Sequence, residues 1–151
     1  MGAGFREVKL VKVKRKHIHL TRSDRYGHWW FEIGDPTDLK SESYGWWPLH
    51  GVTVKQTLAG VEGELNGETH FGGEATRDPH HGESADQEFH PFVAEDDPRS
   101  DEQIADCLRQ FTRRYAGEWR WTFGKGQNCQ SFQQQALDHC QLHQSPTKLG
   151  Y

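Results

Sequence analysis

The chain has 151 residues, a formal net charge of −4 and an apolar fraction of 33%, with six Trp among its aromatic residues. This length fits a single domain, residues 1–151, and the charge gives no general attraction to nucleic acid. No window approaches the roughly 18 to 20 apolar residues of a membrane span, and no signal-peptide core precedes the domain. We therefore expect a soluble α+β domain, either cytoplasmic or exported without a visible signal.

The first half of the chain predicts strands. Residues 7–20 alternate as one or two strands broken near residues 14–16, and the basic run over residues 9–16 indicates a charged outer face. The strongest strand covers residues 28–33 and is stopped by the turn residues 34–36. Residues 41–47 then predict its hairpin partner, and residues 51–58 a further strand.

A long polar segment separates these strands from two helices. Residues 63–98 show little periodicity and carry four histidines, which is typical of a functional loop or an insert. Ser100 and Gln103 then form a capping box that predicts the start of a helix. The apolar face of that helix is formed by Ile104, Cys107, Leu108, Phe111 and Tyr115.

The last helix begins at a cysteine. Phe132, Ala136 and Leu137 follow Cys129 at helical spacing, which places its sulfur at the buried edge of a helix N-terminus. Unpaired backbone N–H groups and the positive end of the helix dipole favour the thiolate there, and a thiolate is the nucleophile of acyl transfer. The alternative is an ordinary buried thiol at a helix start.

The cysteines do not predict a disulfide framework. There are three of them, and Cys107 and Cys140 fall on the apolar faces of the two predicted helices. We therefore expect at least one thiol outside any disulfide.

A cysteine nucleophile needs a base, and His28 is the candidate among the ten histidines. His139 and His143 lie roughly 15 to 21 Å from Cys129 along the same helix axis. The histidines of residues 63–98 lie in the least ordered segment. His28 instead begins the most strongly predicted strand, which is a rigid mount for a catalytic ring.

Two motifs resemble a known group. Tyr26-Gly27-His28-Trp29-Trp30-Phe31-Glu32-Ile33-Gly34-Asp35 is similar to the histidine strand of the circularly permuted papain-like proteins, which include the lecithin:retinol acyltransferase-like families. Asn128-Cys129-Gln130-Ser131-Phe132 is similar to the nucleophile motif of that group. The two motifs cover about a fifth of the chain and occur in the permuted order.

The resemblance implies an antiparallel sheet packed against two main helices, with Cys129 as nucleophile and His28 as general base and then acid. It also implies a polar residue on the neighbouring strand that orients the histidine. Glu42 is the first choice because a carboxylate stabilises an imidazolium, and Glu32 and His50 are the alternatives.

Stabilisation of the oxyanion is assigned to the start of the last helix. The backbone N–H of Cys129 is the first expected donor, and Gln127 and Asn128 are side-chain candidates. Asn128 has a second interpretation as the helix N-cap, which is the favoured one.

These residues predict a cysteine hydrolase or acyltransferase that cleaves an amide or ester bond through a thioester, as a peptidase or amidase, and they imply no cofactor. The expected substrate is a peptide, a protein or peptidoglycan. An effector or toxin domain of a bacterial protein, with a cognate inhibitor protein, also fits the habits of the group.

Two other functions remain open. One is a non-catalytic binding module on the same fold. The other is a metal-binding protein, for which His17 and His19 share a strand face, although no paired ligand motif such as C-x-x-C or H-E-x-x-H occurs.

Overall fold

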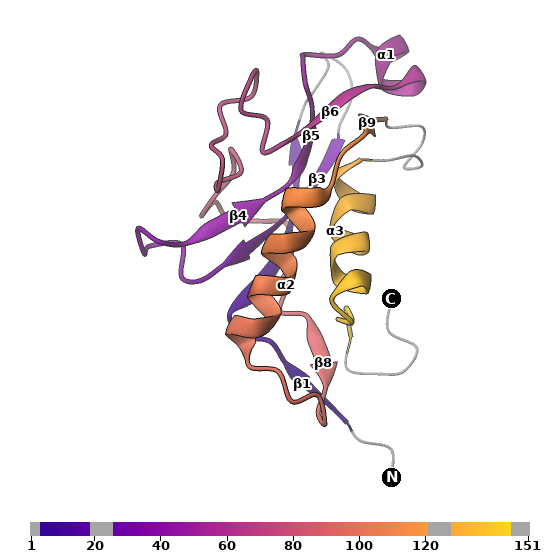
Figure 1. Ribbon diagram of the computed structural model, residues 1–151. Helices are drawn as coiled ribbons and strands as arrows, with labels where there is room; N and C mark the ends of the chain where they lie inside the picture. The colour runs from indigo at the N-terminus through magenta and orange to yellow at the C-terminus, as the bar shows by residue number, and fades with distance from the viewer. Residues whose placement is uncertain (1–3, 19–25, 121–127, 146–151) are drawn as a thin grey trace.

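The computed structural model describes residues 4–18, 26–120 and 128–145, which form an α+β fold of antiparallel sheets and two main helices (Figure 1). The fold class predicted from the sequence is therefore confirmed. In chain order the elements are β1 (Phe5–Glu7), β2 (Val11–Ile18), β3 (Tyr26–Ile33), β4 (Glu42–Tyr44), β5 (Trp46–Pro48), α1 (Val54–Ala59), β6 (Val61–Leu65), β7 (Gln87–Phe89), β8 (Phe92–Ala94), α2 (Asp101–Arg114), β9 (Glu118–Trp119) and α3 (Cys129–His139).

The largest sheet has the order β4-β3-β2-β7 and is antiparallel throughout. Strands β2 and β3 pair along their full length, from Val11 opposite Ile33 to Ile18 opposite Tyr26. The break expected near residues 14–16 is therefore wrong, because the ladder to β3 continues through these residues. Two smaller sheets have the orders β1-β8 and β5-β6-β9.

One face of the large sheet packs against α2 and α3, which lie side by side in Figure 1. Alternate strand residues point to this face, as the two-residue period of a strand requires. The rings of Phe31 and Phe132 stack there with their centroids 6.0 Å apart. The buried residues of this layer are Val11, Val13, Phe31 and Ile33 from the strands, Ile104, Ala105 and Leu108 from α2, and Phe132, Ala136 and Leu137 from α3.

The polar segment covers the part of the opposite face around Lys14 and Glu32. Lys14 Nζ lies 2.9 Å from Glu32 Oε1, and the two side chains are only 6% and 2% exposed. The backbone of the covering segment completes this ion pair, since the Glu83 carbonyl accepts from Lys14 Nζ and the Gly82 N–H donates to Glu32. The expectation of a charged outer face is therefore wrong at Lys14, because a buried charge needs such partners and has them here.

Two local predictions change between β4 and β6. The expected hairpin partner is split at Gly45, so that β4 pairs with β3 whereas β5 pairs with β6. Residues 51–58 contain a helix and not a strand, because Thr53 and Gln56 form a capping box that starts α1. The capping box of Ser100 and Gln103 at the start of α2 is confirmed.

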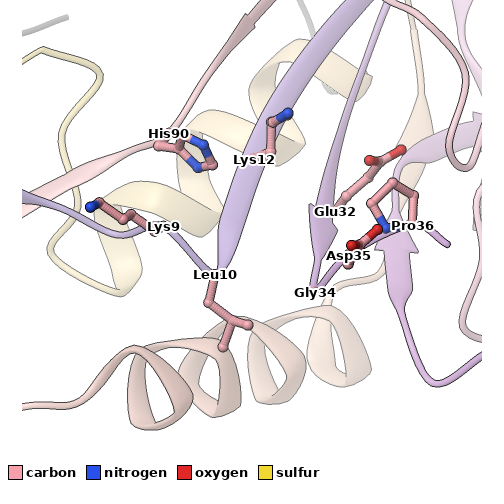
Figure 2. A pocket seen from close by; sticks show the side chains of 8 residues that line it. All are labelled: Lys9, Leu10, Lys12, Glu32, Gly34, Asp35, Pro36 and His90. Atoms are coloured by element: carbon pink, nitrogen blue, oxygen red, sulfur yellow. The ribbon is translucent and has the colours of Figure 1, made fainter. Parts of the chain in front are cut away.

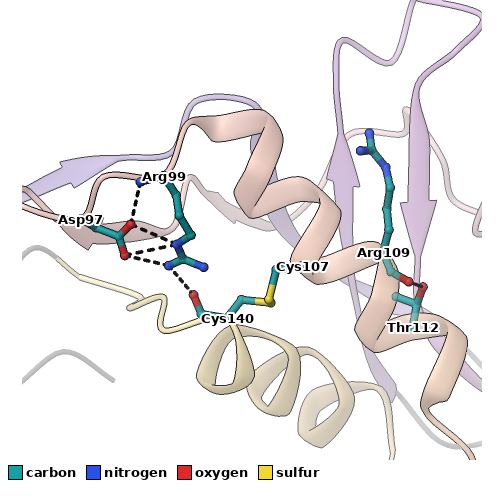
Figure 3. Close-up of a disulfide and its surroundings, with 6 residues drawn as sticks. All are labelled: Asp97, Arg99, Cys107, Arg109, Thr112 and Cys140. Atoms are coloured by element: carbon teal, nitrogen blue, oxygen red, sulfur yellow. Dashed lines mark hydrogen bonds and ion pairs between the residues drawn. A yellow bond between two sulfur atoms is a disulfide. The ribbon is translucent and has the colours of Figure 1, made fainter.

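A disulfide joins the two main helices. Cys107 of α2 and Cys140, the C-cap of α3, are bonded with their Cα atoms 5.9 Å apart (Figure 3). Both residues lie on apolar helix faces as predicted, and they pair because those faces pack against each other, which the sequence did not predict. Cys129 is left as a free thiol, so the expectation of at least one thiol outside any disulfide is confirmed. Arg99 also ties this region together, donating to Asp97 and to the Cys140 carbonyl.

Within the described residues, none of the helices combines the length and the apolar character needed to cross a membrane.

Candidate active site

The candidate site begins at the first turn of α3, where Asn128 is the N-cap. Its side-chain oxygen accepts from the backbone N–H groups of Gln130 and Ser131 at 2.9 and 3.3 Å. Its amide nitrogen donates to the carbonyl of Arg120 at 3.1 Å. Both ends of the Asn128 amide therefore hold the helix start in place, which matches the N-cap interpretation rather than the oxyanion one. Gln127, the other predicted donor, lies outside the described residues.

Cys129 is buried and its sulfur lies against the edge of β3. The Trp29 N–H donates to Sγ at 3.3 Å, and Sγ donates to the Gly27 carbonyl at 3.5 Å. Strand β4 pairs only with residues 31–33 of β3, so the backbone groups of residues 27 and 29 are left for another partner. The thiol takes the place of a neighbouring strand there, directly beside His28.

His28 is fully buried and bonds to a carboxylate that the sequence did not indicate. Its Nε2 lies 2.9 Å from Oδ2 of Asp78, which comes from the polar segment over residues 63–98. Trp47 Nε1 donates to the same oxygen at 2.7 Å, and the His80 N–H donates to Oδ1 at 2.9 Å. The Asp78 N–H in turn donates to Ser43 Oγ at 2.8 Å. The carboxylate is thus held in one orientation from three sides.

The charges of this pair support each other. Burial lowers the pKa of His28, but the charge and hydrogen bond of Asp78 and the interaction with Cys129 outweigh it and raise the pKa to about 9. Burial raises the pKa of Asp78, whereas the charge of His28 and the hydrogen bonds to its oxygens lower it below its ordinary value. At neutral pH the pair is therefore an imidazolium and a carboxylate.

The second ring nitrogen of His28, Nδ1, is not bound to Asp78. Nδ1 is buried and has no partner in hydrogen-bond geometry among the described residues. The Cys129 sulfur nevertheless lies close enough to interact electrostatically with the ring. Because Nε2 is occupied by Asp78, Nδ1 is the atom that remains to exchange a proton with the thiol. The hydrogen bond between a catalytic base and its nucleophile is often poorly aligned before substrate binds.

Aromatic rings and one glycine fix the position of the imidazole. Trp30 stacks on His28 with centroids 5.5 Å apart, and Trp47 packs at 4.1 Å. Gly45 lies against the other side, where a Cβ atom would be 3.0 Å from His28 Cε1 and would collide with the Asp78 carboxylate. The break between β4 and β5 therefore allows the chain to approach the His28–Asp78 pair closely.

The structure places the three predicted orienting residues elsewhere. Glu42 lies opposite Ile33, five residues along β3 from His28, and its carboxylate binds Arg109 at 2.8 Å. Glu32 is held by Lys14 in the buried ion pair. His50 is exposed. The neighbouring strand contributes Ser43 as a support for Asp78 instead of an orienting carboxylate.

Asp78 has no local sequence signal for this role. It stands in a turn-rich stretch without periodicity, so its burial follows only from the packing of that stretch over β3. The one useful indication was the length of the polar segment, because long loops inside compact domains are commonly functional.

A pocket at the other end of β2 and β3 does not belong to this site. Figure 2 shows its lining side chains, which include no cysteine: Lys9, Leu10, Lys12, Glu32, Gly34, Asp35, Pro36 and His90. His90 donates from Nδ1 to the Val11 carbonyl at 2.7 Å, so its ring supports the strand backbone.

Within residues 4–18, 26–120 and 128–145, no three His, Cys, Asp or Glu side chains are arranged to hold a metal ion. The proposed pairing of His17 with His19 cannot be placed, since His19 lies outside the described residues.

Comparison of the chain with family models, curated proteins and solved structures gives no match. A functional assignment therefore depends on the geometry of Cys129, His28 and Asp78.

Proposed function

We propose that this protein is a thiol-dependent hydrolase or acyltransferase in which Cys129 is the nucleophile, His28 the general acid and base, and Asp78 the residue that orients His28. The observation that carries the proposal is that the three side chains are neighbours in space, in the order Cys129, His28 and Asp78. The Cys129 sulfur contacts the backbone of Gly27 and Trp29, and His28 is the residue between these two. The buried carboxylate of Asp78 binds Nε2 of the His28 ring. A nucleophile, a base and an orienting group within hydrogen-bond reach are the recurring parts of such sites.

The chemistry follows from these contacts. In the imidazolium form of His28, Nδ1 already carries the proton taken from the Cys129 thiol, and the thiolate sulfur attacks the carbonyl carbon of an amide or ester. The tetrahedral oxyanion is met by the backbone N–H of Cys129 at the start of α3. When the carbonyl re-forms, His28 gives its proton to the leaving amine or alcohol, and a thioester remains. Water or another acceptor then loses a proton to His28, attacks the thioester and releases the thiol.

Asp78 supports both halves of this cycle. It keeps the imidazole in the orientation that presents Nδ1 to the sulfur, and its charge stabilises the imidazolium that holds the transferred proton. A pKa of about 9 for His28 makes it an acid that is protonated at neutral pH when the leaving group needs a proton. We favour a peptide, protein or peptidoglycan amide as substrate and retain the likeness to permuted papain-like proteins as part of the proposal.

The test is turnover of a panel of peptides, peptidoglycan fragments and acyl esters, followed by mass spectrometry. Cys129→Ala and His28→Ala should each abolish product formation, while circular dichroism and thermal melting show a folded protein. His50→Ala is the matched control, because this histidine is exposed and lies outside the site. Full activity in either site variant on a substrate that the parent protein turns over would refute the proposal.

The complete burial of Cys129 and His28 favours a second candidate, a binding module with a closed site. Alkylation separates the two functions. A reactive nucleophile should be alkylated by iodoacetamide at a rate that falls strongly in His28→Ala, because the imidazolium stabilises the thiolate. In a binding module the alkylation of Cys129 would be slow and independent of His28.

A further inference from the structure

A basic side chain covers the backbone next to the Cys129 sulfur. Arg15 lies on β2 directly opposite Trp29 of β3, and its guanidinium packs over the Trp29 ring at 5.9 Å from the centroid. It also reaches along the strand to Gly27, where a Cβ atom would lie 2.7 Å from Arg15 Nε. Gly27 is the residue whose carbonyl accepts from Cys129 Sγ. The guanidinium and the reacting sulfur therefore both lie against Gly27.

The charge of Arg15 is not committed to a carboxylate. No ion pair joins its guanidinium to an acidic side chain among the described residues, whereas eleven other Lys, Arg and His side chains there form such pairs. Asp86 is the nearest acid in the network, and its carboxylate accepts from the backbone N–H of His17 at 2.8 Å and contacts the His17 ring. The Asp86 N–H also donates to the Arg15 carbonyl, and after the hydrogen bond from His17 the charge of Arg15 is a minor cause of the lowered pKa of the Asp86 carboxyl, without an ion pair between them.

Packing leaves the donors of the guanidinium available. The contact with Trp29 is a cation–π contact, which does not use the N–H donors of the guanidinium. Arginine presents these donors in a fork that matches the two oxygens of a carboxylate. The start of α3 adds the positive end of a helix dipole on the same side of β3.

We propose that Arg15 is a specificity-determining residue that binds an anionic group of the substrate, a carboxylate placed next to the scissile carbonyl. This inference deepens the proposed function and rests on it, because it takes Cys129 as the reacting atom. It predicts that acyl groups with a neighbouring carboxylate are preferred over neutral ones of the same size. Lys14 and Lys16 cannot take this role, since they lie on the other face of β2 and bind Glu32 and Glu83.

A pair of alkylating reagents tests the inference without a known substrate. Iodoacetate and iodoacetamide are nearly equal in size and react alike: the sulfur forms a bond to the CH₂ carbon and iodide leaves. Only iodoacetate carries a carboxylate. The measurement is the ratio of the two alkylation rates at Cys129, followed by peptide mass spectrometry and divided by the same ratio for a small free thiol.

In the parent protein the normalised ratio should favour iodoacetate, and Arg15→Gln should lower it roughly threefold or more, as expected for one half-screened charge contact. Arg15→Lys should keep most of the preference, and added salt should reduce it. Lys12→Gln removes a charge from the other face of the same strand and should leave the ratio unchanged. An equal ratio in the parent and Arg15→Gln would overturn the role of Arg15 while leaving the proposed function standing. Absence of any Cys129 alkylation would overturn both.

Discussion

Replacement of Asp78 by Asn tests the electrostatics of the candidate site most directly. The substitution keeps the size of the side chain and removes its charge, so the ring of His28 stays buried without a compensating carboxylate. The pKa of His28 should then fall from about 9 to below its ordinary value of 6.5, because burial, the largest single effect on the ring, then outweighs the remaining interaction with Cys129. Turnover should fall about a hundredfold or more, which is the usual contribution of a well-oriented acid and base.

The same change alters how stability depends on pH. A histidine whose pKa is raised to about 9 in the folded protein adds stability that is fully present below pH 6.5 and is lost as the pH rises through 9. The difference between the two values corresponds to roughly 3 kcal/mol. In Asp78→Asn this loss should disappear, and stability should instead decrease as the pH falls below 6.5, since a buried neutral histidine must then take up a proton.

The assay is urea unfolding of the parent protein and Asp78→Asn between pH 5.5 and 9.5, together with an NMR titration of the His28 ring. Comparison of the two proteins cancels the contribution of the other histidines. A His28 pKa that stays near 9 in the variant, or an unchanged pH profile of stability, would refute the assignment of Asp78 as the partner of His28.

Three further outcomes follow from the contacts. Gly45→Ala should destabilise the protein by about 1 to 3 kcal/mol in thermal or urea unfolding, because the added Cβ collides with the Asp78 carboxylate; an unchanged melting temperature would contradict the close packing. Loss of the Cys107–Cys140 disulfide in the double Ser variant should lower the unfolding free energy by roughly 3 to 4 kcal/mol, given the 33-residue separation of the two cysteines. Equal urea midpoints for the parent protein and the variant would contradict this expectation. Glu42→Gln should leave kcat within about twofold of the parent, since its carboxylate lies outside the site; a loss as large as that of Asp78→Asn would reverse their roles.

Periodicity and capping made several parts of this protein predictable. The strand-forming residues 28–33 and the turn after them predicted β3, and the capping box at Ser100 predicted the start of α2. The Asn128 cap and the apolar spacing after Cys129 predicted α3 in the same way. These signals are local, because a strand or a helix end is specified by residues that are neighbours in the chain. The positions of His28 and Cys129 on their elements followed from them.

Contacts between distant segments were not predictable in this way. The wrong expectation of a strand over residues 51–58 is a separate case, because the capping box of Thr53 and Gln56 that starts α1 is a local signal. Cys107 and Cys140 were each placed on the correct helix face, but only the packing of α2 on α3 brings their Cα atoms to 5.9 Å. Such errors arise where pairing depends on which faces meet.

The amino-acid sequence by itself therefore determined the α+β class, the helix that carries Cys129 and the strand that carries His28, because each depends on a local pattern. Only the tertiary structure decided which acid completes the group. Asp78 comes from a segment without periodicity, and it becomes the partner of His28 because that segment folds over the far face of β3 and buries its carboxylate there. An acid in a loop is selected by burial and by its hydrogen bonds, and both are properties of the folded chain.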